Sequence, residues 1–283
     1  QQKVLGAAAY VHSMKDYTML ILSGQAKNGQ QLDAVKDLLI NELKRIGEGN
    51  FDEQMLSSIV NNARLNEMRG LEMNENRASA LMNAFIKHKG ERWQYDVGFL
   101  DEMGRTSKKD LMEFAQRSLK NNYIVVYKRN GKEEEIAKVE KPAITPIKIN
   151  RDAQSDFVSQ VISAAATPVN PQWLDYQKDM TFSKAGNADL LYVNNPVNGL
   201  FNLYYHFDRG KWNNEFLPYA TMYLSYLGTK SKSTEVISKA FYDIACNFNI
   251  SVDDEETTVM ISGLQENFEQ AVSLFEELVQ HAQ

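Results

Sequence analysis

The stretch LPYATMYLSYLGTKS, residues 217–231, carries Tyr219, Met222 and Tyr223 at a spacing that is typical of metal-binding helices. Residues four apart lie on one face of a helix, about one turn from each other. In the pattern H-x-x-E-H, two histidines at this spacing bind zinc, and the glutamate is the general base. Here both ligand positions hold tyrosine and the base position holds methionine. The segment is therefore either a metal helix without its chemistry or an ordinary core helix.

The side chains at these three positions cannot form a catalytic zinc centre. Tyr219 and Tyr223 offer only phenol oxygens, and phenols are poor zinc ligands beside imidazole. Met222 has no proton to exchange and cannot be the general base. On either interpretation, we expect the helix to contribute by packing.

The remaining candidate ligands do not form a site either. A run of four acidic residues at 253–256 lacks the spaced oxygen ligands and the glycine of a calcium loop, so we expect a solvated hairpin turn. The single cysteine, Cys246, excludes an intrachain disulfide and a cysteine-based zinc site. We expect His206, in a predicted strand, at the surface or half-buried. No two histidines lie within one helical turn: His12, His88, His206 and His281.

The sequence therefore predicts no catalytic residue, no metal ligand and no cofactor in this chain. It contains no G-x-S-x-G, no P-loop and no G-x-G-x-x-G, so it gives no support for a serine hydrolase or for a nucleotide-binding protein. A net charge of −6 without a basic cluster argues against nucleic acid as a partner. No apolar run approaches the roughly 20 residues of a membrane span.

Periodicity predicts an α+β protein with antiparallel sheets and helices packed on one face. In the first half, we expect strands at 4–12, 16–24 and 123–127, with a turn at Lys15 and Asp16. Helices are expected at 30–46, from a capping box at 50–53 to about Arg69, at 75–88, and from a capping box at Ser107. In the second half, we expect a hairpin of 190–193 with 200–207, strands at 248–252 and 257–263, and helices at 217–227, 233–245 and from 267 to the end.

Residues 132–172 have the composition of a connector, with three consecutive glutamates at 133–135 and four prolines. We expect a short helix near 155–165 within it. The predicted domains are thus 1–131, the linker 132–172, and 173–283. The first residues, QQKVLGAAAY, carry neither Met nor a leader and resemble the entry to a strand, so we expect a piece of a longer polypeptide.

An internal similarity links the two halves. TMLILSG (18–24) matches TTVMISG (257–263), with identical Thr, Ser and Gly at equivalent positions. The helical segments that follow, LDAVKDLL (32–39) and FEQAVSLF (268–275), also match, after a loop that is slightly longer in the first half. Two interpretations stay open: convergent strand–turn–helix patterning, or slightly more than one copy of a duplicated unit.

The order of these pieces resembles the pitrilysin/insulinase-type metallopeptidases, the inverted zincins related to mitochondrial processing peptidase. FDEQMLSSIVNNARLNE (51–67) and MGRTSKKDLMEFAQRSLKNNYIVVYKRNGK (103–132) are similar to the later part of one family unit. Residues 200–279, with YLGT at 226–229 and NISVDDEETTVMISGLQENFEQAVSLFEELV at 249–279, are similar to the earlier part of the next unit. In the family the H-x-x-E-H motif directly precedes a segment like Leu227-Gly228-Thr229, which places its degenerate positions at Tyr219, Met222 and Tyr223.

The resemblance implies a non-catalytic fragment of a zinc metalloendopeptidase. The parent would hydrolyse peptides with zinc bound in a unit upstream, and this chain would supply chamber walls and a linker. Its expected partners are the peptide substrate, the remaining units of the parent, and a second copy through exposed sheet edges. The alternative is an inactive peptidase homologue that acts as a binding or assembly partner. A bacterial cell envelope or periplasm is the location that the resemblance suggests.

Overall fold

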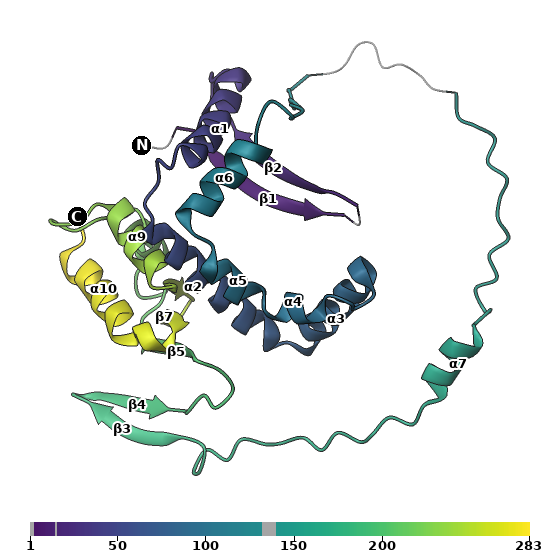
Figure 1. Cartoon of the computed structure of the whole chain (residues 1–283). Coiled ribbons are helices and arrows are strands. Elements are labelled where there is room, and N and C mark those ends of the chain that lie inside the picture. The colour runs from purple at the N-terminus through teal and green to yellow at the C-terminus, as the bar shows by residue number, and fades with distance from the viewer. Residues whose placement is uncertain (1–2, 15, 132–139) are drawn as a thin grey trace. The chain divides into compact units, whose positions relative to one another are not determined.

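The computed structural model describes residues 3–14, 16–131 and 140–283, and it consists of helices and small antiparallel sheets (Figure 1). This confirms the predicted α+β class. Residue contacts divide the chain into two units, one made of Gln1–Val126 with Asn195–Gln283 and the other of Tyr127–Asn194. Lys15 of the predicted turn and the glutamates at 133–135 lie outside the described residues.

The larger unit contains most of the secondary structure. Its elements before the connector are β1 (Gly6–Ser13), β2 (Thr18–Gln25), α1 (Leu32–Gly47), α2 (Gln54–Leu71), α3 (Asn74–His88), α4 (Trp93–Val97), α5 (Phe99–Arg105) and α6 (Lys108–Ser118). Its later elements are β5 (Leu200–Phe207), α8 (Leu217–Leu224), α9 (Thr234–Asp243), β6 (Cys246–Val252), β7 (Thr257–Leu264), the single-turn η1 (Gln265–Asn267) and α10 (Phe268–His281). The smaller unit contains α7 (Asp156–Ser163) and a hairpin of β3 (Thr181–Ala185) with β4 (Ala188–Tyr192).

The two halves of the larger unit fold alike where their sequences match. Both hairpins, β1–β2 and β6–β7, have the same register at equivalent positions of the repeat: Ala7 faces Gly24 as Cys246 faces Gly263. Their turns are closed by matching bonds, from Met14 N–H to the Tyr17 carbonyl (2.8 Å) and from Asp253 N–H to the Glu256 carbonyl (2.9 Å). Each hairpin is followed by a helix that contacts its second strand, α1 on β2 and α10 on β7.

The main core lies between the three-stranded sheet β5–β7–β6 and two helices. Ile237 and Phe241 of α9 and Phe275 of α10 are buried with Ile261 of β7, which is fully buried. Successive residues of a strand point to opposite faces, so Ser262 lies on the other face of β7. There it accepts a hydrogen bond from Arg69 of α2 (2.8 Å), so a helix also lies on this face, which the sequence did not predict.

Several predicted elements are confirmed, and the differences have physical causes. The capping box at Ser107 forms, with reciprocal bonds to Asp110. The box predicted at 50–53 does not, because Glu53 is the N-cap without a side-chain bond. The predicted helix at 217–227 ends earlier, at Leu224.

Two strand predictions are wrong. Residues 123–127 form no strand: Ile124 is 93% exposed and Val126 is 88% exposed, in a segment with high strand propensity. The predicted hairpin of 190–193 with 200–207 does not form either. Instead, β4 pairs with β3, and β5 pairs along its whole length with β7, which follows it in the chain only after α8, α9 and β6.

Candidate functional site

Helix α8 carries the three positions that the sequence singled out. Pro218 lies in its first turn, where a residue without an N–H is best tolerated. The Thr221 hydroxyl donates to the carbonyls of Leu217 and Pro218, each at 3.1 Å. After the helix ends at Leu224, Ser225 donates to the Met222 carbonyl (2.8 Å). The polar side chains of this short, mostly apolar helix thus bond to carbonyls of the helix itself.

The side chains at the three motif positions are at the surface. Tyr219 is 65% exposed, Met222 63% and Tyr223 61%. The expected contribution by packing is therefore small for these residues. The structure brings them together on one short helix, as their spacing predicts.

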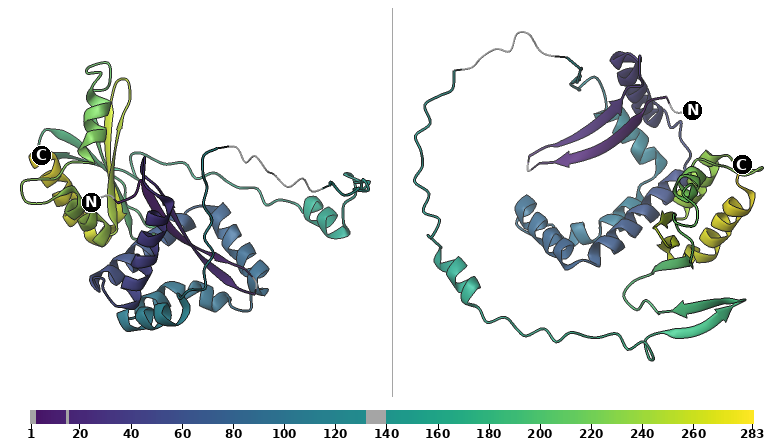
Figure 2. Two further views of the ribbon diagram at one scale, coloured as in Figure 1. Left: turned by 90° about the horizontal axis from the view of Figure 1, so that it is seen from above. Right: turned by 180° about the vertical axis from the view of Figure 1, so that it is seen from behind.

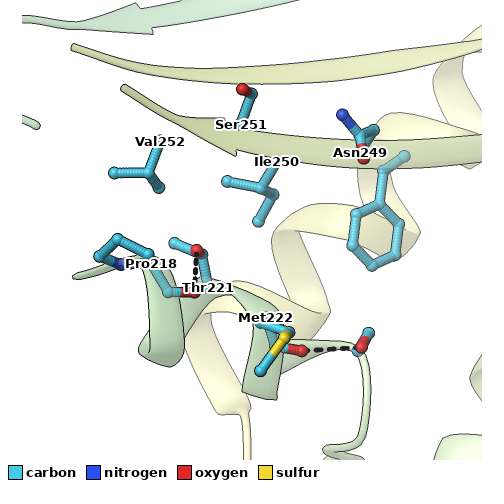
Figure 3. A pocket seen from close by; sticks show the side chains of 9 residues that line it. Pro218, Thr221, Met222, Asn249, Ile250, Ser251 and Val252 are labelled. Carbon is cyan, nitrogen blue, oxygen red and sulfur yellow. Dashed lines mark hydrogen bonds between the residues drawn. The ribbon is translucent and has the colours of Figure 1, made fainter. Parts of the chain in front are cut away.

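A groove lies between α8 and the outer strand β6 (Figure 3). Its volume is about 430 Å³. Figure 3 shows Pro218, Thr221 and Met222 of the helix facing the strand. The strand side of the groove consists of Phe248, Asn249, Ile250, Ser251 and Val252, and Ser225 completes the lining.

The edge of β6 at this groove presents backbone hydrogen-bonding groups. Asp253 bonds to Glu256, and Leu264 N–H donates to the carbonyl of Ala245. Alternate residues of a strand direct their backbone groups to the same edge, so Phe248, Ile250 and Val252 direct theirs away from β7. An extended peptide could pair with these groups, and the groove could hold its side chains.

The donor set around α8 does not fit zinc. The described residues contain no group of three or more His, Cys, Asp or Glu side chains that could hold a metal ion. The four histidines lie on four different elements: His12 on β1, His88 on α3, His206 on β5 and His281 on α10. His88 bonds to Asp96 (2.9 Å), and His206 bonds to Thr258 (3.1 Å).

Cys246 is not a nucleophile in this structure. Its side chain is buried at the start of β6, and burial raises the pKa of the thiol to about 11. At neutral pH the group is therefore a thiol, whereas the thiolate is the reactive form.

The sequence prediction missed the β6 side of the groove. In CNFNISV, the apolar side chains of Phe248, Ile250 and Val252 alternate with Asn249 and Ser251. This alternation is typical of a strand with one buried face. What it could not reveal is that α8 would lie beside this strand.

Among the comparisons with known proteins, matches were found in solved structures. No family model matches the sequence, and no curated protein matches it. The chain is similar to the periplasmic protease PqqL from Escherichia coli, with 13% identity and a TM-score of 0.32, over 99% of this chain and 34% of that one. It is also similar to the ferredoxin protease FusC, solved as a mutant in complex with Arabidopsis ferredoxin, with 13% identity and a TM-score of 0.35, over 100% of this chain and 34% of that one. The chain thus spans about a third of the length of both structures.

Among the helices of the described residues, none combines the length and the apolar character needed to cross a bilayer.

Proposed function

We propose that this chain is a non-catalytic part of a zinc metalloendopeptidase, in which it forms a wall of the peptide chamber and the linker between units. The observation that carries the proposal is the groove between α8 and β6. It joins a helix with the spacing of a metal motif, but without ligands, to a strand edge that can pair with an extended peptide.

The residue types on α8 and in the groove beside it support binding and not hydrolysis, although of the three motif positions only Met222 lines the groove. Tyr219 and Tyr223 stand where a zinc motif would have its two histidines, and Met222 stands where it would have its base. Backbone groups of β6 would supply affinity for a peptide main chain, and the apolar lining would supply contacts for alternate side chains. Peptide capture at this edge requires neither a metal nor a proton transfer.

Zinc analysis tests the assignment to a metallopeptidase. We expect far less than one zinc per chain in this protein, and about one in the longer protein from which it derives. Tight one-to-one zinc in this chain would contradict the proposal. Zinc in neither protein would favour the second candidate, an inactive peptidase homologue that acts as a binding partner, because the groove is independent of metal.

A pair of variants tests the groove itself. Ile250→Pro removes an outward backbone N–H from β6, whereas Ile250→Ala keeps it. With a fluorescein-labelled (Val-Lys)₄ peptide, we expect Ile250→Pro to weaken binding about tenfold relative to Ile250→Ala. Equal affinities would show that the peptide does not use this edge.

A further inference from the structure

A second groove lies in the first half of the larger unit, between α2 on one side and the end of α5 with the residues before α6 on the other. Figure 2 shows this part of the chain, in blue and teal, from two further sides. The volume of the groove is about 330 Å³, which is near the lower end of the range for ligand pockets. A space of this size suits one long side chain or a small molecule.

Part of the groove is apolar. Leu56 and Val60 lie four residues apart on one face of α2, Met103 of α5 belongs to the opposite wall, and all three are half-buried. A Cβ atom on Gly104 would lie 3.9 Å from a methyl group of Val60, so the backbone of α5 approaches α2 closely here. The methylene groups of a long side chain could cover these apolar residues.

The hydroxyl groups that line the groove already use their protons. Each donates a hydrogen bond to an oxygen atom no more than four residues away, at 2.8 Å for Ser57, 3.1 Å for Thr106 and 2.6 Å for Ser107. A hydroxyl that donates its proton within the chain still has a lone pair to offer. The groove therefore presents these groups to a ligand as hydrogen-bond acceptors.

Glu53, the charged residue of the lining, adds a stronger acceptor. It stands at the N-terminal end of α2, where the helix dipole favours an ionised carboxylate. The basic side chains close to the groove in sequence bind elsewhere: Lys108 donates to the Phe51 carbonyl and Arg105 to Glu102, each at 2.7 Å. Within the described residues the Glu53 side chain has no ion pair, so its charge is available to a cation.

An acceptor-rich groove with one carboxylate and an apolar wall matches the chemistry of arginine. The guanidinium group has one positive charge, five N–H donors and no acceptor, and its alkyl stem packs on apolar surface. We propose that this groove binds an arginine side chain of another polypeptide, with the guanidinium at Glu53 and the stem against Leu56 and Val60. A free polyamine fits less well, because it brings at least two positive charges to one carboxylate. The site is separate from the groove at β6 and does not rest on the function proposed above.

A small amide provides the probe. N-acetyl-arginine amide is titrated into the ¹⁵N-labelled full chain, and N-acetyl-citrulline amide, which has a similar shape without the charge, is its matched control. We expect the arginine compound to bind at least about tenfold more tightly, because only a charged donor forms charge-assisted hydrogen bonds with Glu53. The amide signals of Leu56, Ser57 and Gly104 should shift as it binds.

Four variants locate the site. Glu53→Gln should weaken binding of the arginine compound about tenfold and remove its advantage over the citrulline compound. Glu67→Gln removes the same charge from an exposed position further along α2 and should leave both affinities unchanged. Gly104→Leu should block the groove beside Val60, whereas Gly104→Ala adds only a Cβ atom at an ordinary contact distance and should keep binding. Circular dichroism checks that each variant keeps the fold.

Any of four results would overturn the proposal. The first is equal affinity for the arginine and citrulline compounds, and the second is an equal loss with Glu53→Gln and Glu67→Gln. The third is tighter binding of agmatine, which carries a second positive charge, because the groove would then take a free diamine and not a peptide side chain. The fourth is a set of shifts confined to Phe248 and Ile250 on β6, which would place the compound in the groove of the proposed function.

Discussion

The Ser58 hydroxyl of α2 donates a 2.7 Å hydrogen bond to the carboxylate of Asp243 at the end of α9, across 185 residues of sequence. Lys239 of α9 donates to the same carboxylate at 2.7 Å. One turn further along α2, the Asn62 side chain donates to the Tyr242 carbonyl, also at 2.7 Å. Polar contacts therefore join the first half of the larger unit to the second half, beside the buried apolar cluster that contains Leu65 and Leu264.

Ser58→Ala should destabilise the larger unit by about 1–3 kcal/mol, because Ser58 is only 1% exposed. The substitution removes the hydroxyl group and leaves the Asp243 carboxylate with one hydrogen-bond donor fewer. Urea denaturation followed by circular dichroism gives the free energy of unfolding. Ser57→Ala is the matched control, since Ser57 is exposed and its hydroxyl donates to the Gln54 carbonyl of its own helix. A loss no larger than that of the control would show that the contact contributes nothing to stability.

The same cluster predicts a dependence of stability on pH. The hydrogen bond from Lys239 holds the pKa of Asp243 below its ordinary value of 3.8, and the bond from Ser58 acts in the same direction. A carboxyl group with a lowered pKa stabilises the folded state above its unfolded pKa, and this stabilisation is lost as the pH falls through the folded pKa. Asp243→Asn should therefore destabilise the protein at pH 6, and the difference from wild type should shrink from about pH 4 downward. A difference that is constant over this range would contradict the assignment.

The sequence predicts local structure well in this chain because the local signals are strong. α1 begins two residues from the expected start, and the capping box at Ser107 forms as predicted. Both hairpins that the repeat identifies form from the strands that the alternation predicted. Tyr219, Met222 and Tyr223 lie on one helix, as their spacing predicts.

Contacts between distant segments could not be predicted in the same way. The prediction paired β5 with the strand before it, because short connections are common, but its partner β7 lies beyond two helices and another strand in the chain. Residues 123–127 have strand propensity, and a strand also needs a neighbour for its backbone bonds. The groove depends on the position of α8 beside β6, which no periodicity encodes.

The exposure of the motif side chains predicts that they contribute little to stability. Tyr223→Ala should change the free energy of unfolding by less than about 0.5 kcal/mol, as is usual at the surface. Leu278→Ala, in the core on α10, should cost about 2–5 kcal/mol, because Leu278 is only 1% exposed. If Tyr223→Ala cost as much as Leu278→Ala in the same denaturation experiment, α8 would be a core helix after all.

The two glycines that the repeat shares should respond differently to the same substitution. A Cβ atom on Gly263 would lie 2.4 Å from the Cys246 sulfur and 2.6 Å from the backbone oxygen of Ala245. On Gly24 it would lie 2.6 Å from a methyl group of Val35, which belongs to a side chain of α1 and not to the backbone. We expect Gly263→Ala to cost about 1–3 kcal/mol or more, and Gly24→Ala to cost less, because α1 can shift away from a hairpin that is exposed.

Gly199→Ala is the control for this comparison, since a Cβ atom there would meet no atom within 4 Å. Thermal and urea denaturation of the three variants rank the costs. If the destabilisation is largest for Gly263→Ala, smaller for Gly24→Ala and smallest for Gly199→Ala, the later hairpin is packed tightly against its neighbours. The earlier hairpin would then be packed less tightly. Equal costs for Gly263→Ala and Gly24→Ala would mean that the β1–β2 hairpin is packed against α1 as tightly as its counterpart is packed against its own neighbours.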